Sequence, residues 1–359
     1  MNAIPKIDMQ EATRLTREGR LDEAMALLRG APMPTTAAAA HQPGVKAKAL
    51  ASLLQRMPKL TGLKRGPAMP APSVPVPEGA RFEERTHANA AGARPYKVYA
   101  PSGYAGQPLP LVVMLHGCTQ SPDDFAAGTR MNELAEAHTF IVVYPAQTQA
   151  ANVSKCWNWF NARDQQREGG EPAIIAGITR DVMREFSVDA GRVYVAGLSA
   201  GGAAAAIMGA THPDLYAAIG VHSGLMCGAA SDLPSALTAM RQGASVTRNA
   251  TGEMVPTIVF HGDRDSTVHA INGEQVMAQA RAGSAHVTQV VHGEEAGVSY
   301  TQTVERDETG RPLREHWVLH GAGHAWSGGS TLGSYADASG PDASREMVRF
   351  FLLQRRPEA

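Results

Sequence analysis

Short apolar runs alternate with helical patterns from residue 96 to residue 321 of this chain. Strand–helix alternation of this kind predicts an α/β fold with a doubly wound, mostly parallel sheet. Several runs are continuously apolar and β-branched, as expected of strands buried on both faces. The runs lie at 96–100, 111–115, 140–144, 192–197, 218–223, 257–262 and 316–321, and helical patterns lie between them at 131–138, 172–186 and 273–282.

The segment 298–321 has a different pattern. Two polar, alternating stretches flank Glu308, Thr309 and Gly310. This arrangement predicts a hairpin or a longer antiparallel excursion before the last sheet strand.

The sharpest motif is the sequence Gly-Leu-Ser-Ala-Gly at 197–201. An apolar strand precedes it and an alanine-rich helix follows it. This strand–turn–helix context is typical of a nucleophile elbow, where a serine sits on a strained turn and residues two positions away must lack bulky side chains. The alternative is a glycine-rich turn with an incidental serine. The context favours Ser199 as a nucleophile at a helix N-terminus, whose dipole stabilises negative charge.

A second loop follows the apolar strand at 111–115 and carries His116, Gly117 and Cys118. In hydrolases with a nucleophile elbow, a loop in this place donates one backbone N–H to the oxyanion, and the residue after the serine donates another. We therefore expect the backbone N–H groups of Cys118 and Ala200 to form the oxyanion hole. His116 is interpreted as a structural residue that braces the loop.

Two candidates compete for the catalytic acid. Asp263 and Asp265 both follow the predicted strand at 257–262. Asp265 stands in the pattern H-G-x-x-D-x-x-V and is preferred, with Asp263 as the alternative.

The candidate base is His324, which lies in a glycine-rich loop after the last predicted strand. His316 and His320 lie within that strand and are interpreted as structural. The resulting chain order of Ser199, Asp265 and His324 is that of the α/β-hydrolases.

Composition sets limits on partners and cofactors. The formal net charge is -1 and the isoelectric point is about 6.9, so nothing suggests a nucleic-acid partner. The chain has no apolar run long enough for a transmembrane helix. It also has no H-E-x-x-H, paired C-x-x-C or phosphate-binding loop, so we expect neither metal nor cofactor.

The N-terminal twenty residues carry charges where a secretory signal needs an apolar region. The three cysteines, Cys118, Cys156 and Cys227, cannot form a disulfide framework. We therefore expect a cytoplasmic protein with reduced thiols, and leave secretion by a non-standard route open.

The chain divides into three regions by composition. Residues 1–30 predict a helical hairpin, residues 31–80 a linker rich in proline and alanine, and residues 81–359 the catalytic domain. The linker is basic and lacks acidic residues from 31 to 77. Its 45–57 segment could form an amphipathic helix on a polymer surface, and the alternative is a solvated tether.

The catalytic region resembles the polyhydroxybutyrate depolymerase-like esterases, which are related to feruloyl and acetylxylan esterases. The resemblance implies an α/β-hydrolase fold, a catalytic serine, and esters of short hydroxyacids or plant phenolics as substrates. It places the family's triad on Ser199, Asp265 and His324. The residues that carry it are LHGCTQ (115–120), CWNWF (156–160) and the segments 192–202, 210–224, 261–268 and 321–329.

The resemblance also brings Cys118 and Cys156 together in space, either as a disulfide or as neighbouring thiols. Trp326 lies two residues past the candidate base, so we expect it to line the substrate pocket, since aromatic walls suit apolar acyl chains. Trp157 and Trp159 belong either to the pocket or to the core.

The sequence thus predicts a serine carboxylester hydrolase acting on polyhydroxybutyrate-type polyesters or on short hydroxyacid ester oligomers. The alternative within the class is a feruloyl, acetylxylan or general short-chain carboxylesterase. The alternative from another class is a surface-binding protein whose hydrolase site is vestigial.

Overall fold

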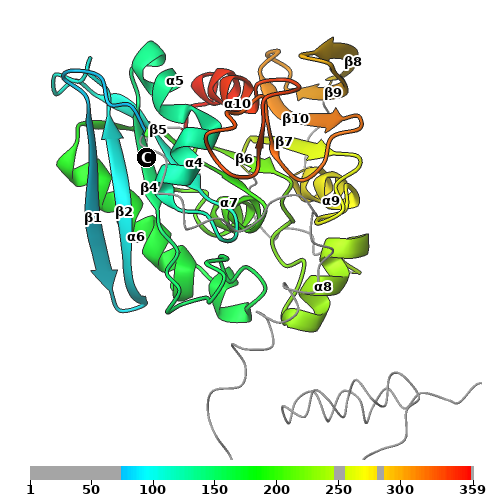
Figure 1. Cartoon of the computed structure of the whole chain (residues 1–359), viewed down its shortest axis with the longest axis horizontal. Helices are drawn as coiled ribbons and strands as arrows, with labels where there is room; N and C mark the ends of the chain where they lie inside the picture. Colours follow the sequence, from blue (N-terminus) through cyan, green and yellow to red (C-terminus); the bar gives the residue numbers. More distant parts are fainter. Residues whose placement is uncertain (1–73, 246–254, 281–286, 357–359) are drawn as a thin grey trace, which may run out of the picture. The chain divides into compact units, whose positions relative to one another are not determined.

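The computed structural model describes residues 74–245, 255–280 and 287–356. Its centre is a ten-stranded sheet in the order β1-β2-β4-β3-β5-β6-β7-β10-β9-β8 (Figure 1). The predicted hairpin at 1–30 and almost all of the linker at 31–80 lie outside the described residues. The strands are β1 Arg81–Asn89, β2 Gly92–Ala100, β3 Leu109–Leu115, β4 Ile141–Pro145, β5 Val188–Leu198, β6 Ala218–His222, β7 Thr257–Gly262, β8 Val287–Glu295, β9 Val298–Arg306 and β10 Pro312–Leu319.

Six neighbouring strands, from β4 to β10 in the sheet order, pair in parallel. Antiparallel pairs extend the sheet at both edges, β1 and β2 on one side and β9 and β8 on the other. The prediction of a mostly parallel, doubly wound sheet is therefore confirmed. Two short strands, β11 Trp326–Ser327 and β12 Ala336–Asp337, pair with each other outside the main sheet.

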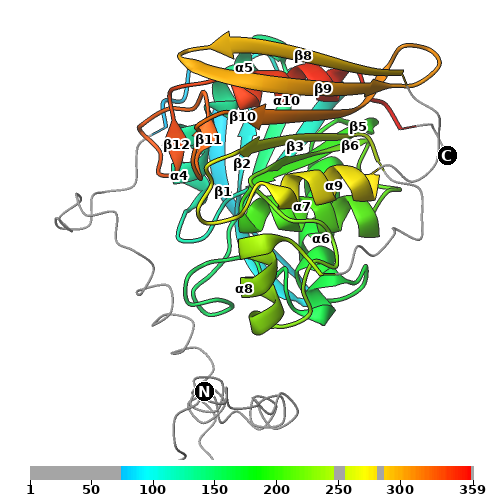
Figure 2. The same ribbon diagram turned by 90° about the vertical axis from the view of Figure 1, so that its right-hand side faces the viewer.

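Helices cover both faces of the sheet, as Figure 2 shows: α6 to α9 lie on one face, and α5 and α10 on the other. Each face buries its own apolar cluster, because strands such as β3 and β4 are buried along their whole length. None of the described helices is long and apolar enough to cross a membrane. The helices are α4 Pro122–Thr129, α5 Met131–His138, η1 Ala162–Gln165, α6 Gly170–Glu185, α7 Ala200–Thr211, α8 Leu233–Gln242, α9 Ile271–Ala280 and α10 Ala343–Leu352.

The antiparallel excursion predicted for 298–321 is present as β9 and β10, joined by a turn in which the N–H of Gly310 donates to the Asp307 carbonyl. The excursion is larger than predicted, since β8 extends it by one more strand. Strands β1 and β8 escaped prediction because both are sheet edges with many exposed polar residues, so they lack the apolar run that marks the central strands.

Candidate active site

Ser199 lies between the end of β5 and the start of α7, where the chain turns sharply. Its φ of 58° and ψ of -117° are strained for a residue with a side chain. The turn needs glycine on both sides: a Cβ on Gly197 would lie 2.3 Å from the Gly201 carbonyl oxygen, and one on Gly201 would lie 1.9 Å from that of Leu115. The elbow geometry inferred from the sequence therefore has a steric cause.

The candidate acid and base are in contact. His324 Nδ1 lies 2.6 Å from Asp265 Oδ2. The other carboxylate oxygen of Asp265 accepts the backbone N–H groups of Thr267 and Val268, each at 2.8 Å. Asp265 follows β7 and His324 follows β10, and these strands pair in parallel, so their carboxyl ends meet at the same edge of the sheet. A proton on Nδ1 would leave Nε2 of His324 as the basic nitrogen.

The electrostatics of Asp265 favour its ionised form. Burial of the side chain would by itself raise its pKa. The hydrogen bond from His324, the charge on that imidazole, the Val268 N–H and nearby His261 outweigh burial, and the pKa of Asp265 is lowered. A buried carboxylate that stays ionised can orient an imidazole and stabilise its protonated form.

The alternative acid, Asp263, has other partners. Its carboxylate contacts His320 Nδ1 at 3.0 Å and accepts the backbone N–H of Gly321 at 2.7 Å. The Asp263 and His320 side chains are 38% and 42% exposed, whereas that of Asp265 is fully buried. Only Asp265 of the two candidates pairs with His324. His320 lies one residue beyond β10 rather than within the strand.

In the loop after β3, several backbone donors have acceptors and that of Cys118 does not, among the described residues. Gly117 N–H donates to Gln120 Oε1 at 2.8 Å, Thr119 N–H donates to the Ser154 carbonyl at 2.7 Å, and Gln120 N–H points back to Gly117. The N–H of Cys118 has no acceptor among the described residues. Ala200 begins α7, where backbone N–H groups have no partner within the helix. The N–H groups of Cys118 and Ala200 therefore remain the candidates for the oxyanion hole.

His116 braces this loop from inside the protein. It is 1% exposed, and its Nε2 accepts the backbone N–H of Gln147 at 3.0 Å. Its Nδ1 therefore carries the proton and donates to the Gly117 carbonyl at 2.7 Å. Burial lowers the pKa of His116 to about 4, so the imidazole is neutral near pH 7.

Cys118 and Cys156 form a disulfide in the structure, with their Cα atoms 4.2 Å apart. This arrangement differs from the expectation of reduced thiols. The bond ties the loop that carries the open N–H group to the segment that contains Trp157 and Trp159. Cys227 takes no part in this disulfide and is half-buried.

We predict that non-reducing mass spectrometry of protein purified without reductant will show one linked peptide pair containing Cys118 and Cys156. Reduction should not remove the candidate oxyanion donor, because the backbone N–H does not depend on the sulfur. It should nevertheless loosen the loop, shift this N–H and lower kcat. Two alkylatable thiols at these positions in unreduced protein would rule out the bond.

The three tryptophans considered for the substrate pocket, Trp157, Trp159 and Trp326, are buried in the interior. Trp326 is 1% exposed, and its Nε1 donates to Ser344 Oγ at 3.0 Å. Trp157 is fully buried and donates to the His116 carbonyl at 3.1 Å. Trp159 is 6% exposed. The expectation that Trp326 lines the pocket therefore does not hold in this structure, because proximity in sequence to His324 does not fix the direction of a side chain.

His222 supports the candidate site from the interior, although the sequence did not indicate such a role. Its carbonyl accepts the N–H of Ser199 at 2.9 Å, and its Nε2 accepts the N–H of Ser327 at 3.1 Å. The ring stacks between Phe260 and Trp326, and burial lowers its pKa to about 3. The residue connects the nucleophile to the loop that carries the base. A histidine at the end of an apolar strand resembles an ordinary core residue, so its sequence signal is weak.

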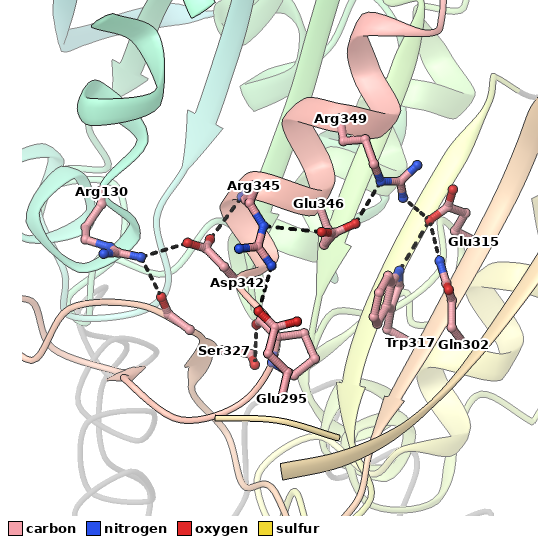
Figure 3. A network of polar contacts seen from close by, with 12 residues as sticks. Arg130, Glu295, Gln302, Glu315, Trp317, Ser327, Asp342, Arg345, Glu346 and Arg349 are labelled. Atoms are coloured by element: carbon pink, nitrogen blue, oxygen red, sulfur yellow. Dashed lines mark hydrogen bonds and ion pairs between the residues drawn. The ribbon is translucent and has the colours of Figure 1, made fainter. Parts of the chain in front are cut away.

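Arg130, which directly precedes α5, also holds the loop after His324. Arg130 donates to the Gly328 carbonyl at 3.1 Å. It also donates to the Asp342 carboxylate at 2.7 Å (Figure 3). These contacts fix both ends of the segment that follows the candidate base. Preorganisation of this kind keeps a catalytic imidazole in one orientation.

The fold and site together define an α/β-hydrolase with a serine at the nucleophile elbow. The sequence model of the family described as "Esterase PHB depolymerase" matches residues 94–291, which is more than half of the chain. The chain belongs to this family.

Individual relatives agree with this placement. The chain is 33% identical over 238 residues to poly(3-hydroxyalkanoate) depolymerase C of Paucimonas lemoignei, covering 63% of this chain and 57% of that protein. It is 28% identical over 200 residues to acetylxylan esterase A of Aspergillus oryzae, covering 51% and 64%. The chain thus spans less than two thirds of the length of either relative.

Solved structures support the fold. An acetyl xylan esterase from Aspergillus awamori superposes with a TM-score of 0.61 at 20% identity, covering 76% of this chain and 99% of that one. An S-formylglutathione hydrolase from Agrobacterium tumefaciens gives a TM-score of 0.52 at 13% identity, covering 78% and 98%. Both likenesses concern the fold alone.

Proposed function

We propose that this chain is a serine carboxylester hydrolase. The observation that carries the proposal is the 2.6 Å contact between His324 and the buried Asp265, on strands that share an edge with the Ser199 elbow. An orienting carboxylate, an imidazole and a strained serine form the set that nucleophilic acyl transfer requires. A vestigial site would not need to retain this set together with an open oxyanion loop.

The reaction follows from these groups. His324 Nε2 takes the hydroxyl proton of Ser199, whose Oγ attacks the ester carbonyl carbon. The N–H groups of Cys118 and Ala200 stabilise the oxyanion, and Asp265 stabilises the imidazolium. Collapse of the tetrahedral intermediate breaks the bond to the alcohol, which leaves with the proton from His324. Water, deprotonated by the same imidazole, then releases the acid and restores the serine.

We propose polyhydroxybutyrate-type polyesters or short hydroxyacid ester oligomers as the substrate class. Family membership and the 33% identical relative, named as a poly(3-hydroxyalkanoate) depolymerase, support this choice. The relatives named acetylxylan and feruloyl esterases supply the alternative.

A substrate panel separates these alternatives. We expect kcat/KM on 3-hydroxybutyrate oligomers to exceed that on methyl ferulate and on acetylated xylan, with p-nitrophenyl esters as the soluble reference. A clear preference for the ferulate or the xylan would assign the chain to that branch instead. Loss of all hydrolysis, with the fold intact by circular dichroism, would contradict the esterase proposal itself.

We further propose that the basic linker contacts the polymer surface. It carries six Lys and Arg residues and no acidic residue between positions 31 and 77. A tether of this kind raises the local concentration of a catalytic domain at a surface. A variant that starts at Pro77 should match the full chain on a soluble ester and lose activity on dispersed polyester. Equal rates on both substrates would remove any role of the linker in polymer contact.

A further inference from the structure

Glu171 is a buried carboxylate that the proposed reaction does not use. It lies in the first turn of α6 and is 5% exposed. Its Oε2 accepts the backbone N–H of Asn158 at 2.7 Å, and its Oε1 accepts the Asn158 side-chain amide at 2.7 Å. The side-chain amide of Gln147 also donates to Oε1. One carboxylate therefore holds two residues from different segments.

These partners fix the segment that contains Cys156. The Gln147 amide donates to the Cys156 carbonyl at 3.0 Å. Asn152 completes the arrangement, since its amide donates to Asn158 Oδ1 at 3.0 Å and its own Oδ1 accepts the Cys156 N–H at 3.3 Å. The position of Cys156 is therefore set by a network with Glu171 at its centre.

The Cys156 segment in turn holds the oxyanion loop. The disulfide joins it to Cys118, and Thr119 N–H donates to the Ser154 carbonyl. On the other side of Cys118, the His116 carbonyl accepts the Trp157 indole N–H, and the His116 ring accepts the Gln147 backbone N–H. The Cys118 N–H is thus flanked on both sides by contacts that lead back to Glu171.

We propose that Glu171 is a positioning residue for the oxyanion hole: through Asn158, Gln147 and the disulfide it sets the place of the Cys118 N–H. This inference rests on the proposed esterase function. The geometry of oxyanion donors governs catalysis strongly, because they stabilise charge only when aimed at the transition-state oxygen.

The carboxylate cannot be exchanged for an amide without a local conflict. The Glu171 carboxylate accepts three N–H groups, two from Asn158 and one from Gln147. Each of its two oxygens accepts at least one of them. A glutamine in its place has one acceptor and one donor group, so an N–H would face another N–H in either orientation. Glutamine has nearly the volume of glutamate, so the facing N–H groups could separate only by moving Asn158 or Gln147 away.

The test compares Glu171→Gln with Glu315→Gln. Glu315 is a matched control, since it is 1% exposed and accepts Gln302 Nε2 at 3.1 Å, Trp317 Nε1 at 3.3 Å and Arg349 (Figure 3). It lies on β10, and none of its direct partners Gln302, Trp317 and Arg349 lies in the oxyanion loop. Both variants are to be assayed on a p-nitrophenyl ester at a temperature where circular dichroism shows each to be folded.

We expect Glu171→Gln to lower kcat by about 10- to 100-fold, in the range that small misplacements of catalytic groups produce, with KM changed less than about twofold. Glu315→Gln should keep kcat within about twofold of the wild type. A trifluoromethyl ketone, which forms an oxyanion on the serine, should lose affinity for Glu171→Gln by a factor similar to the loss in kcat.

A pH profile gives an independent readout. Burial raises the pKa of Glu171 to about 7, and Asp164 from η1, which accepts the Glu171 N–H, acts in the same direction. Arg94 from β2 also faces the carboxylate, at 3.6 Å. As pH falls through 7, protonation of the Glu171 carboxylate should disturb the network and lower kcat in the wild type. The Glu171→Gln variant has no such carboxylate, so its kcat should fall less steeply on the acid side of the pH profile.

Unchanged kcat in Glu171→Gln, or equal losses in both variants, would overturn the positioning role. A wild type that hydrolyses no ester would instead overturn the proposed function, so the two failures are distinguishable. A rise in KM with kcat retained would assign Glu171 to ground-state binding and would also contradict the inference.

Discussion

Replacing Ser199 with alanine is expected to lower kcat on a p-nitrophenyl ester by a factor on the order of 10⁴ or more. The substitution removes the hydroxyl oxygen that would form the acyl-enzyme in the proposed reaction, while the backbone N–H groups of Cys118 and Ala200 and the His324 imidazole remain. Measurement of kcat for purified Ser199→Ala beside the wild type gives the ratio directly.

The fold should survive this substitution. The Ser199 side chain makes no capping hydrogen bond to α7, and the contacts of its backbone with His222 and Ala203 do not involve Oγ. Alanine meets the same positive φ as serine. Ser187→Ala is a suitable control, because this half-buried serine directly precedes β5, at the opposite end of the strand from Ser199. Hydrolysis by Ser199→Ala at a near wild-type rate would show that another nucleophile acts.

Replacing Asp265 with asparagine is expected to lower kcat by about 10⁴-fold, as the loss of the triad carboxylate does in other serine hydrolases. The amide would favour the wrong tautomer of His324 and would not stabilise the imidazolium. Asp263→Asn should lower kcat by less than about tenfold, because the Asp263 carboxylate pairs with the exposed His320. Parallel kcat measurements on the two variants test the assignment, and the reverse ranking would transfer the acid role to Asp263.

The central sheet and the elbow were predictable because their causes are local. Runs such as 111–115 are apolar throughout, which marks a strand buried on both faces. The glycines at 197 and 201 follow from the steric demands of the turn around Ser199. The chain order of nucleophile, acid and base then indicated the fold.

The features that the sequence could not predict depend on contacts between segments that are distant in the chain. Asp263 and Asp265 occupy one turn, and their partners after β10 and their burial distinguish them. The burial of Trp326 depends on Phe125 of α4 and Ser344 of α10, which no local pattern connects. Glu171 directly precedes the helical pattern at 172–186 and carries no signal of its own in the sequence, and its link to the Cys156 segment exists only in the fold.

Covalent labelling tests the central claim most directly. A fluorophosphonate reacts with a serine only when that serine is activated by its base and its product is stabilised in an oxyanion hole. We predict one label per chain, located by peptide mapping on Ser199, with esterase activity lost in proportion to labelling. The Ser199→Ala variant should take up no label. Labelling of another residue, or persistent hydrolysis in fully labelled protein, would contradict the account.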